Sequence, residues 1–113
     1  MRVTLLEPAN YTNIDFNGQM VFSWQTSRPL EGKECYEAVF WSDSPNNWQR
    51  SYGIVGAGPN TRIERTYNAE YEATSQWLKP GGVYYWGVLL IEDCQAYQTR
   101  SLVSDVRTIT YRK

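Results

Sequence analysis

The stretch Val83–Ile91 constrains the fold more than any other part of the sequence. It reads Val-Tyr-Tyr-Trp-Gly-Val-Leu-Leu-Ile, and aromatic and β-branched residues favour extended strands. Lys79-Pro-Gly-Gly82 precedes it, and proline followed by glycine is typical of a sharp turn. Side chains alternate sides along a strand, so one set should face a core: Tyr84, Trp86, Val88 and Leu90.

Other segments with a two-residue period lie on both sides of this strand. In Met20–Gln25, for example, Met20, Phe22 and Trp24 share one face. Turn clusters rich in proline, glycine and asparagine separate the segments about every eight to twelve residues. The expected strands are Val3–Leu6, Met20–Gln25, Tyr36–Trp41, Trp48–Val55, one or two within 61–73, Val83–Ile91 and about Val103–Tyr111. About seven short strands predict an all-β fold, a two-sheet antiparallel β-sandwich.

Composition excludes several classes of function. The 113 residues suit one domain, 1–113, and no apolar run is long enough to insert into a membrane. The net charge is −1 and no basic run exceeds Arg112-Lys113, so nucleic-acid binding is not expected. No signal-peptide pattern follows Met1, so the chain is expected to be either a cytosolic protein or, as the favoured alternative, a module cut from a longer chain.

Catalytic and metal chemistry lack their usual residues. The chain has no histidine, which removes the commonest general base and metal ligand. The acidic residues Glu64, Glu70, Glu72, Glu92 and Asp93 are scattered over strands and loops, where carboxylates are usually solvated. We therefore expect no enzyme activity, no cofactor and no metal site. Asn10-Tyr-Thr12 has the pattern of a glycosylation acceptor, which matters only in a eukaryotic secretory setting and often occurs by chance.

The segment from Leu78 to Val88 resembles the E–F corner of fibronectin type III domains. In that family a leucine is followed by Pro-Gly and, six positions after the leucine, by a tyrosine; Leu78 and Tyr84 have this spacing. The tyrosine hydroxyl of such a corner bonds to nearby backbone and fixes the crossover between sheets. Trp24 matches the core tryptophan of the family, and Tyr36 matches the aromatic residue that opens its third strand. The Trp77-Leu78 pair with Tyr-Tyr-Trp is also similar to immunoglobulin-like modules of bacterial surface and secreted proteins.

The resemblance implies a non-catalytic spacer, docking or adhesion module that is extracellular, on the cell surface or periplasmic. In such a fold the strands that begin near Cys35 and end near Cys94 are antiparallel neighbours, so both cysteines would lie at one end. A Cys35–Cys94 disulfide is then geometrically feasible, and it would imply an oxidising compartment. The alternative is two free thiols in a loop.

One sheet is expected to be apolar on both faces. If Tyr84 faces the core, then Tyr85, Leu89 and Ile91 point outward, together with Val39 and Trp41 of the neighbouring strand. In the opposite sheet, Ser23 and Gln25 lie outside. An apolar face of this kind is either covered by the long segment 42–75 or used to bind a partner. The predicted partner-binding residues are Val39, Trp41, Trp48, Tyr52, Tyr85, Leu89 and Ile91.

Three functions from different classes remain open. The first is a structural or protein-interaction module, whose partner is a neighbouring domain or a second copy of the chain. The second is a carbohydrate-binding module that stacks sugars on Trp41, Trp48 and Tyr52. The third is a small enzyme, which requires two carboxylates at catalytic spacing in one cleft.

Overall fold

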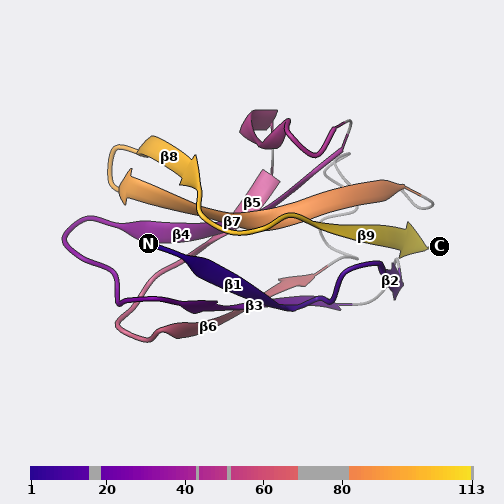
Figure 1. Cartoon of the computed structure of the whole chain (residues 1–113), viewed down its shortest axis with the longest axis horizontal. Coiled ribbons are helices and arrows are strands. Elements are labelled where there is room, and N and C mark those ends of the chain that lie inside the picture. Colours follow the sequence, from indigo (N-terminus) through magenta and orange to yellow (C-terminus); the bar gives the residue numbers. More distant parts are fainter. Residues whose placement is uncertain (16–18, 43, 51, 69–81, 113) are drawn as a thin grey trace.

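The chain forms two β-sheets that pack face to face (Figure 1). The computed structural model describes residues 1–15, 19–42, 44–50, 52–68 and 82–112. Within these residues there are nine strands and one 3-10 helix. They are β1 (Val3–Glu7), β2 (Thr12–Asp15), β3 (Gln19–Thr26), β4 (Cys35–Trp41), η1 (Trp48–Arg50), β5 (Tyr52–Gly56), β6 (Arg62–Asn68), β7 (Val83–Asp93), β8 (Gln98–Leu102) and β9 (Arg107–Arg112).

One sheet has the order β1-β3-β6, and the other has the order β2-β9-β7-β4-β5, with β8 also paired to β7. The all-β, two-layer prediction is confirmed, but the expectation of purely antiparallel sheets is wrong. β2 pairs with β9 in parallel, from Thr12 opposite Ile109 to Asp15 opposite Arg112. The reason is that the chain crosses from one sheet to the other after β1 and continues in the same direction as the C-terminal segment. Val3 and Ser104 already form a parallel bridge at the start of this path.

The main core lies between the sheets and is rich in aromatic rings. Phe22 contacts Trp86 edge-on with their centroids 5.0 Å apart, and Trp24 contacts Tyr36 at 6.1 Å. The members buried from β3, β4, β7 and β9 are Phe22, Trp24, Tyr36, Ala38, Phe40, Tyr84, Trp86, Val88, Leu90 and Ile109. The predicted alternation of Val83–Ile91 and of Met20–Gln25 is confirmed for the members whose burial is described.

The outer side of the three-stranded sheet differs from expectation at Ser23, which is only 2% exposed. Ser23 stands in the central strand, opposite Glu7 of β1 and Glu64 of β6. A short side chain at the centre of a sheet is enclosed by the longer side chains of its neighbours. Ser23 is therefore buried although it is polar.

A second apolar cluster covers the outer side of the six-stranded sheet. Val39, Trp41 and Leu89 form its buried part, and the half-buried side chains packed against them are Trp48, Tyr85, Leu102 and Val106. The segment Trp48–Val55 was expected to be one strand, but it begins as the helix η1. Helical geometry lets Trp48 fold back onto the sheet.

The C-terminal region differs from the expected strand Val103–Tyr111: β9 begins only at Arg107, and β8, which ends at Leu102, was not predicted. β8 and β9 both pair with β7, and residues 103–106 interrupt them. At the interruption the Ser104 hydroxyl accepts the N–H of Val88 at 2.9 Å, in place of a backbone carbonyl. Val106 therefore joins the outer cluster while Ile109 lies in the main core, on opposite sides of the sheet.

Part of the predicted corner falls outside the described residues. Leu78, Lys79, Pro80 and Gly81 lie at such positions. Tyr84 is 6% exposed, and its ring lies over Gly82: a Cβ atom at residue 82 would stand 2.7 Å from the ring. A glycine is thus required where the tyrosine folds back over the chain. Among the described residues, no helix has the length and apolar character needed to cross a bilayer.

Candidate functional site

One end of the molecule gathers three connections and the start of the chain. β3 ends and β6 begins there, since Gln25 pairs with Arg62, and β4 begins where β5 ends, since Tyr36 pairs with Gly56. β7 reaches the same end, because Ile91 is opposite Cys35. The connections 27–34, 57–61 and 94–97 therefore lie together, at the left of Figure 1. Connections grouped on a rigid sheet framework are where binding residues are commonly found.

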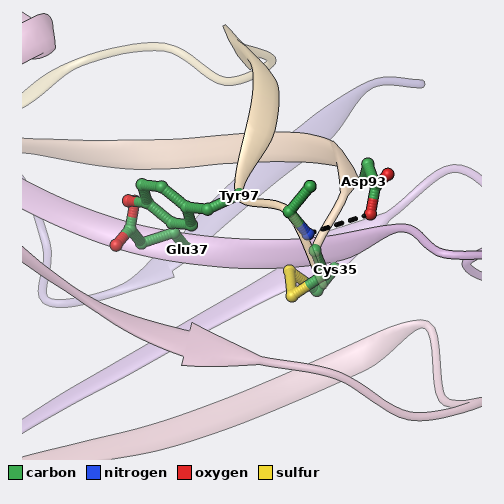
Figure 2. The surroundings of a disulfide bond; sticks show 6 residues. Cys35, Glu37, Asp93 and Tyr97 are labelled. Atoms are coloured by element: carbon green, nitrogen blue, oxygen red, sulfur yellow. Dashed lines mark hydrogen bonds between the residues drawn. A yellow bond between two sulfur atoms is a disulfide. The ribbon is translucent and has the colours of Figure 1, made fainter.

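The predicted disulfide joins two of these elements. Cys35 opens β4, Cys94 follows β7, and their Cα atoms are 5.6 Å apart. The N–H of Cys94 also donates to the carbonyl oxygen of Lys33 at 2.9 Å. Inside the turn, Asp93 Oδ1 accepts the N–H of Ala96 at 3.1 Å, the dashed line in Figure 2. The turn between β7 and β8 is thus fixed covalently to β4 and closed by its own hydrogen bond.

Tyr97 projects from this turn and is anchored at its hydroxyl. Its backbone has φ +53°, a left-handed conformation that is rare for a residue with a side chain. Its side chain returns across β4, where the hydroxyl donates a hydrogen bond to Glu37 Oε1 (Figure 2). Tyr97 is nevertheless 45% exposed. The hydroxyl end of the side chain is fixed, and nearly half of the residue's surface remains exposed to solvent.

Glu37 is the carboxylate that makes this arrangement stable. It is only 7% exposed, on the outer side of β4. A buried carboxylate is costly without partners, and Glu37 has two: the Tyr97 hydroxyl and Arg100, whose Nη1 is 3.9 Å away. The Arg100 guanidinium also lies over the Tyr97 ring, 5.3 Å from its centroid. We call Glu37, Tyr97 and Arg100 the tyrosine cluster.

The electrostatics of the tyrosine cluster keep the hydroxyl protonated. Burial first, and then the hydrogen bond and negative charge of Glu37, raise the pKa of Tyr97 above its ordinary value. Arg100 acts in the opposite direction, with a smaller effect on this pKa. The hydroxyl therefore remains a hydrogen-bond donor throughout the physiological pH range.

The neighbouring connection, 27–34, is held by an ion pair. Arg28 donates to both carboxylate oxygens of Glu34, at 2.8 and 2.9 Å, and Glu34 Oε1 accepts the N–H of Glu31 at 2.7 Å. The hydrogen bond from Arg28 is the largest cause that lowers the pKa of Glu34. Two of the three connections at this end thus have internal cross-links.

The predicted partner-binding residues are mostly not at the surface. Val39, Trp41, Leu89 and Ile91 were expected to point to the exterior, but each is at most 1% exposed. Their direction was predicted correctly, and of the two alternatives left open for this face the structure shows a covered one. Trp48, from the 42–75 segment, and Leu102 and Val106, from beyond β7, cover the three residues Val39, Trp41 and Leu89.

The remaining predicted residues lie at the edge of this cover. Trp48 and Tyr85 are half-buried, and the Tyr85 ring centroid is 6.2 Å from that of Trp41. The backbone of Tyr52 pairs with that of Phe40 in the sheet, and the Tyr52 side chain is outside the part of the chain that the structure describes. Trp41 donates its indole N–H to the carbonyl oxygen of Ser44 at 2.8 Å. The platform of Trp41, Trp48 and Tyr52 therefore lacks an accessible ring at Trp41.

The sequence contained one signal for the tyrosine cluster. Glu37 shares a strand face with Val39 and Trp41, both apolar. A carboxylate on an apolar face needs a partner, but the partner is 60 positions further along the chain.

The acidic residues considered for catalysis do not converge. Glu64 and Glu92 are exposed on β6 and β7, and Asp93 bonds within its own turn. Glu70 and Glu72 lie outside the described residues. In the described part of the chain, no group of three or more His, Cys, Asp or Glu residues could hold a metal ion.

A groove of about 480 Å³ lies between β1 and residues 102–107. Arg107 closes one side of it and connects β9 to the bend that follows β1. Its guanidinium donates hydrogen bonds at 2.8, 2.9 and 3.0 Å to the carbonyl oxygens of Leu5, Leu6 and Pro8. Leu5 and Leu6 belong to β1, where the pairing with β3 is irregular between Leu5 and Glu7, and Pro8 follows the strand, so these bonds have the structural role of joining β9 to the end of β1.

Comparisons with family models, with curated proteins and with solved structures found no match for this chain.

Proposed function

We propose that the chain is a non-catalytic protein-interaction module of an extracytoplasmic protein, of the fibronectin type III or immunoglobulin-like kind. The contact surface is the end that carries the disulfide, and Tyr97 is its central residue. The observation that carries this proposal is an exposed tyrosine held by a disulfide-linked turn and a buried carboxylate.

Preorganisation is the physical reason. A binding residue that is already ordered loses little conformational entropy on association, which improves affinity. Tyrosine is enriched among the residues that dominate protein interfaces, because it combines a large apolar area with a polar group. A strained φ and a buried carboxylate both carry a cost in stability, and costs of this kind are characteristic of functional sites.

The disulfide supports the extracytoplasmic assignment. Disulfides persist in secreted and periplasmic proteins, whereas the cytosol keeps thiols reduced. A spacer role is also supported, since β1 begins near the left end of the long axis in Figure 1 and β9 ends near the right. Such placement suits modules connected in series.

The test is site-directed photo-cross-linking in the full-length protein in its source cells. A benzophenone amino acid at position 97 should capture a protein, while the same group at position 11 should not. Tyr11 is 75% exposed and lies on the bend between β1 and β2, so it is a matched control for exposure. Capture at both positions alike, or at position 11 only, contradicts the proposed surface.

Affinity for the captured protein should then separate the ring from the hydroxyl. Tyr97→Ser should weaken binding by about tenfold or more, as expected for a central aromatic contact. Tyr97→Phe keeps the ring and should retain most of the affinity, while Tyr11→Ser should have no effect. A Tyr97→Ser variant that binds as well as the native chain would refute the assignment.

A further inference from the structure

The bend between β1 and β2 contains Asn10-Tyr11-Thr12, the one Asn-X-Ser/Thr pattern in the sequence. The bend is exposed: Asn10 faces solvent, and Tyr11 is the most exposed large hydrophobic side chain in the described part of the chain, at 75%. It is also well ordered by hydrogen bonds. The N–H of Tyr11 donates to the Thr108 carbonyl at 2.7 Å, and the N–H of Thr12 donates to the Ala9 carbonyl at 3.2 Å.

The two polar atoms of the Asn10 side-chain amide differ in their hydrogen bonding. Oδ1 accepts the N–H of Thr108 at 2.8 Å, which fixes the side chain against β9. No hydrogen bond joins Nδ2 to any residue that the structure describes. Nδ2 is the atom that glycosyl transfer modifies, and an amide that carries a sugar on nitrogen keeps its oxygen as an acceptor. The structural role of Asn10 and a modification at Nδ2 are therefore compatible.

We propose that Asn10 is an acceptor for an N-linked glycan; this rests on the extracytoplasmic location proposed above, reached through a eukaryotic secretory pathway. In the transfer, Nδ2 forms a bond to C1 of a sugar donated by a lipid pyrophosphate-linked oligosaccharide. The bond between C1 and the phosphate oxygen breaks, and the lipid pyrophosphate leaves with the electron pair. The amide loses one proton to a base of the transferase.

A glycan at this position protects an edge of the six-stranded sheet. Of the described strands, β2 is the outermost on that side, with β9 as its neighbour. Edge strands carry backbone groups that can pair with another chain, and proteins protect such edges by covering them. A bulky, soluble glycan at the residue that enters β2 covers this edge.

The glycan does not obstruct the proposed contact surface. Thr12 pairs with Ile109, and Ile109 pairs with Tyr84 near the start of β7. Cys94 lies beyond the opposite end of that strand. A glycan at Asn10 is thus near the far end of β7 from Tyr97.

The experiment is secretion of the chain from cultured mammalian cells behind a cleavable signal peptide, followed by intact-mass analysis before and after peptide N-glycosidase. The secreted chain should lose the mass of a glycan and convert Asn10 to aspartate. Asn10→Asp is the matched control, because it keeps an oxygen acceptor for Thr108 and abolishes the acceptor pattern. Thr12→Ala should also prevent glycosylation, and Thr12→Ser should preserve it.

The outcomes separate this inference from the proposed function. A chain that is secreted with its disulfide formed but carries no glycan overturns the inference and leaves the interaction proposal standing. A chain that is retained in the cells with free thiols contradicts the extracytoplasmic assignment itself. Sedimentation supplies a second readout: Asn10→Asp should self-associate at lower concentration than the glycosylated chain, and identical behaviour would refute the role of the glycan at the β2 edge.

Discussion

Removing the Cys35–Cys94 cross-link should destabilise the protein by a large and calculable amount. The bond joins residues separated by 59 positions. The chain-entropy relation for a loop of that length gives about 4 kcal/mol at 25 °C, because the cross-link restricts the unfolded ensemble. Single domains are stable by about 5–15 kcal/mol, so the loss is a large fraction of the total.

Equilibrium unfolding in urea measures this loss in a Cys35→Ala, Cys94→Ala variant. Alanine is preferred to serine because Cys35 is 1% exposed, and a hydroxyl buried there would add its own penalty. With a urea dependence of about 2 kcal/mol per molar, the unfolding midpoint should fall by about 2 M. The native chain in reductant is the control for the lost sulfur atoms and should behave like the variant.

A midpoint that falls by less than about 0.5 M would refute the reasoning, since it corresponds to about 1 kcal/mol or less. Such a result would mean that the unfolded chain is already restricted in this region, or that the folded chain gains stability when the bond is absent.

Three further substitutions test other parts of the structure. Trp41→Asp should destabilise the fold by about 3 kcal/mol or more, because the indole is buried and bonded; a native-like melting temperature would show that Trp41 lies at the surface. Arg107→Met should lower the free energy of unfolding in urea by about 2 kcal/mol or more, because three carbonyl oxygens lose a charged donor. Arg107→Lys should lower it by less. Equal stability of the native chain and both variants would contradict this role of Arg107. Glu37→Gln should lower the pKa of Tyr97 toward its ordinary value, as measured by ultraviolet absorbance against pH. Because folding raises the pKa of Tyr97, the stability that this tyrosine contributes is complete below about pH 10 and is lost as pH rises through the folded-state pKa. Glu37→Gln should therefore reduce the loss of folding stability at alkaline pH. An unchanged titration of Tyr97 would show that Glu37 does not act on it.

The strands that could be predicted from sequence are those with a strong local pattern. Val83–Ile91 alternates so clearly that its core side is predicted residue by residue, and β3 and β4 follow the same rule. The disulfide was one of two alternatives for the cysteines, which the fibronectin-like resemblance placed at one end, and the structure contains it. These features depend on short-range periodicity and on the pairing of neighbouring strands.

The features that could not be predicted depend on distant partners. The extra strand β8 and the late start of β9 accompany an interruption at which Ser104 replaces a backbone acceptor for Val88, and no local pattern in the sequence indicates that exchange. The parallel pairing of β2 rests on a strand of four residues, too short to show a period. The covering of Trp41 needed the helical geometry at Trp48, where alternation had suggested a strand.

Amide ¹⁵N relaxation of residues 95–98 tests directly whether the disulfide holds Tyr97 in place. It is recorded in the oxidised chain and in the Cys35→Ala, Cys94→Ala variant. Order parameters near about 0.85 with the link, falling below about 0.6 without it, are the values this structure leads us to expect. Values already below about 0.6 in the oxidised chain would mean that the tyrosine is not preorganised, and the case for a contact surface at this end would fail.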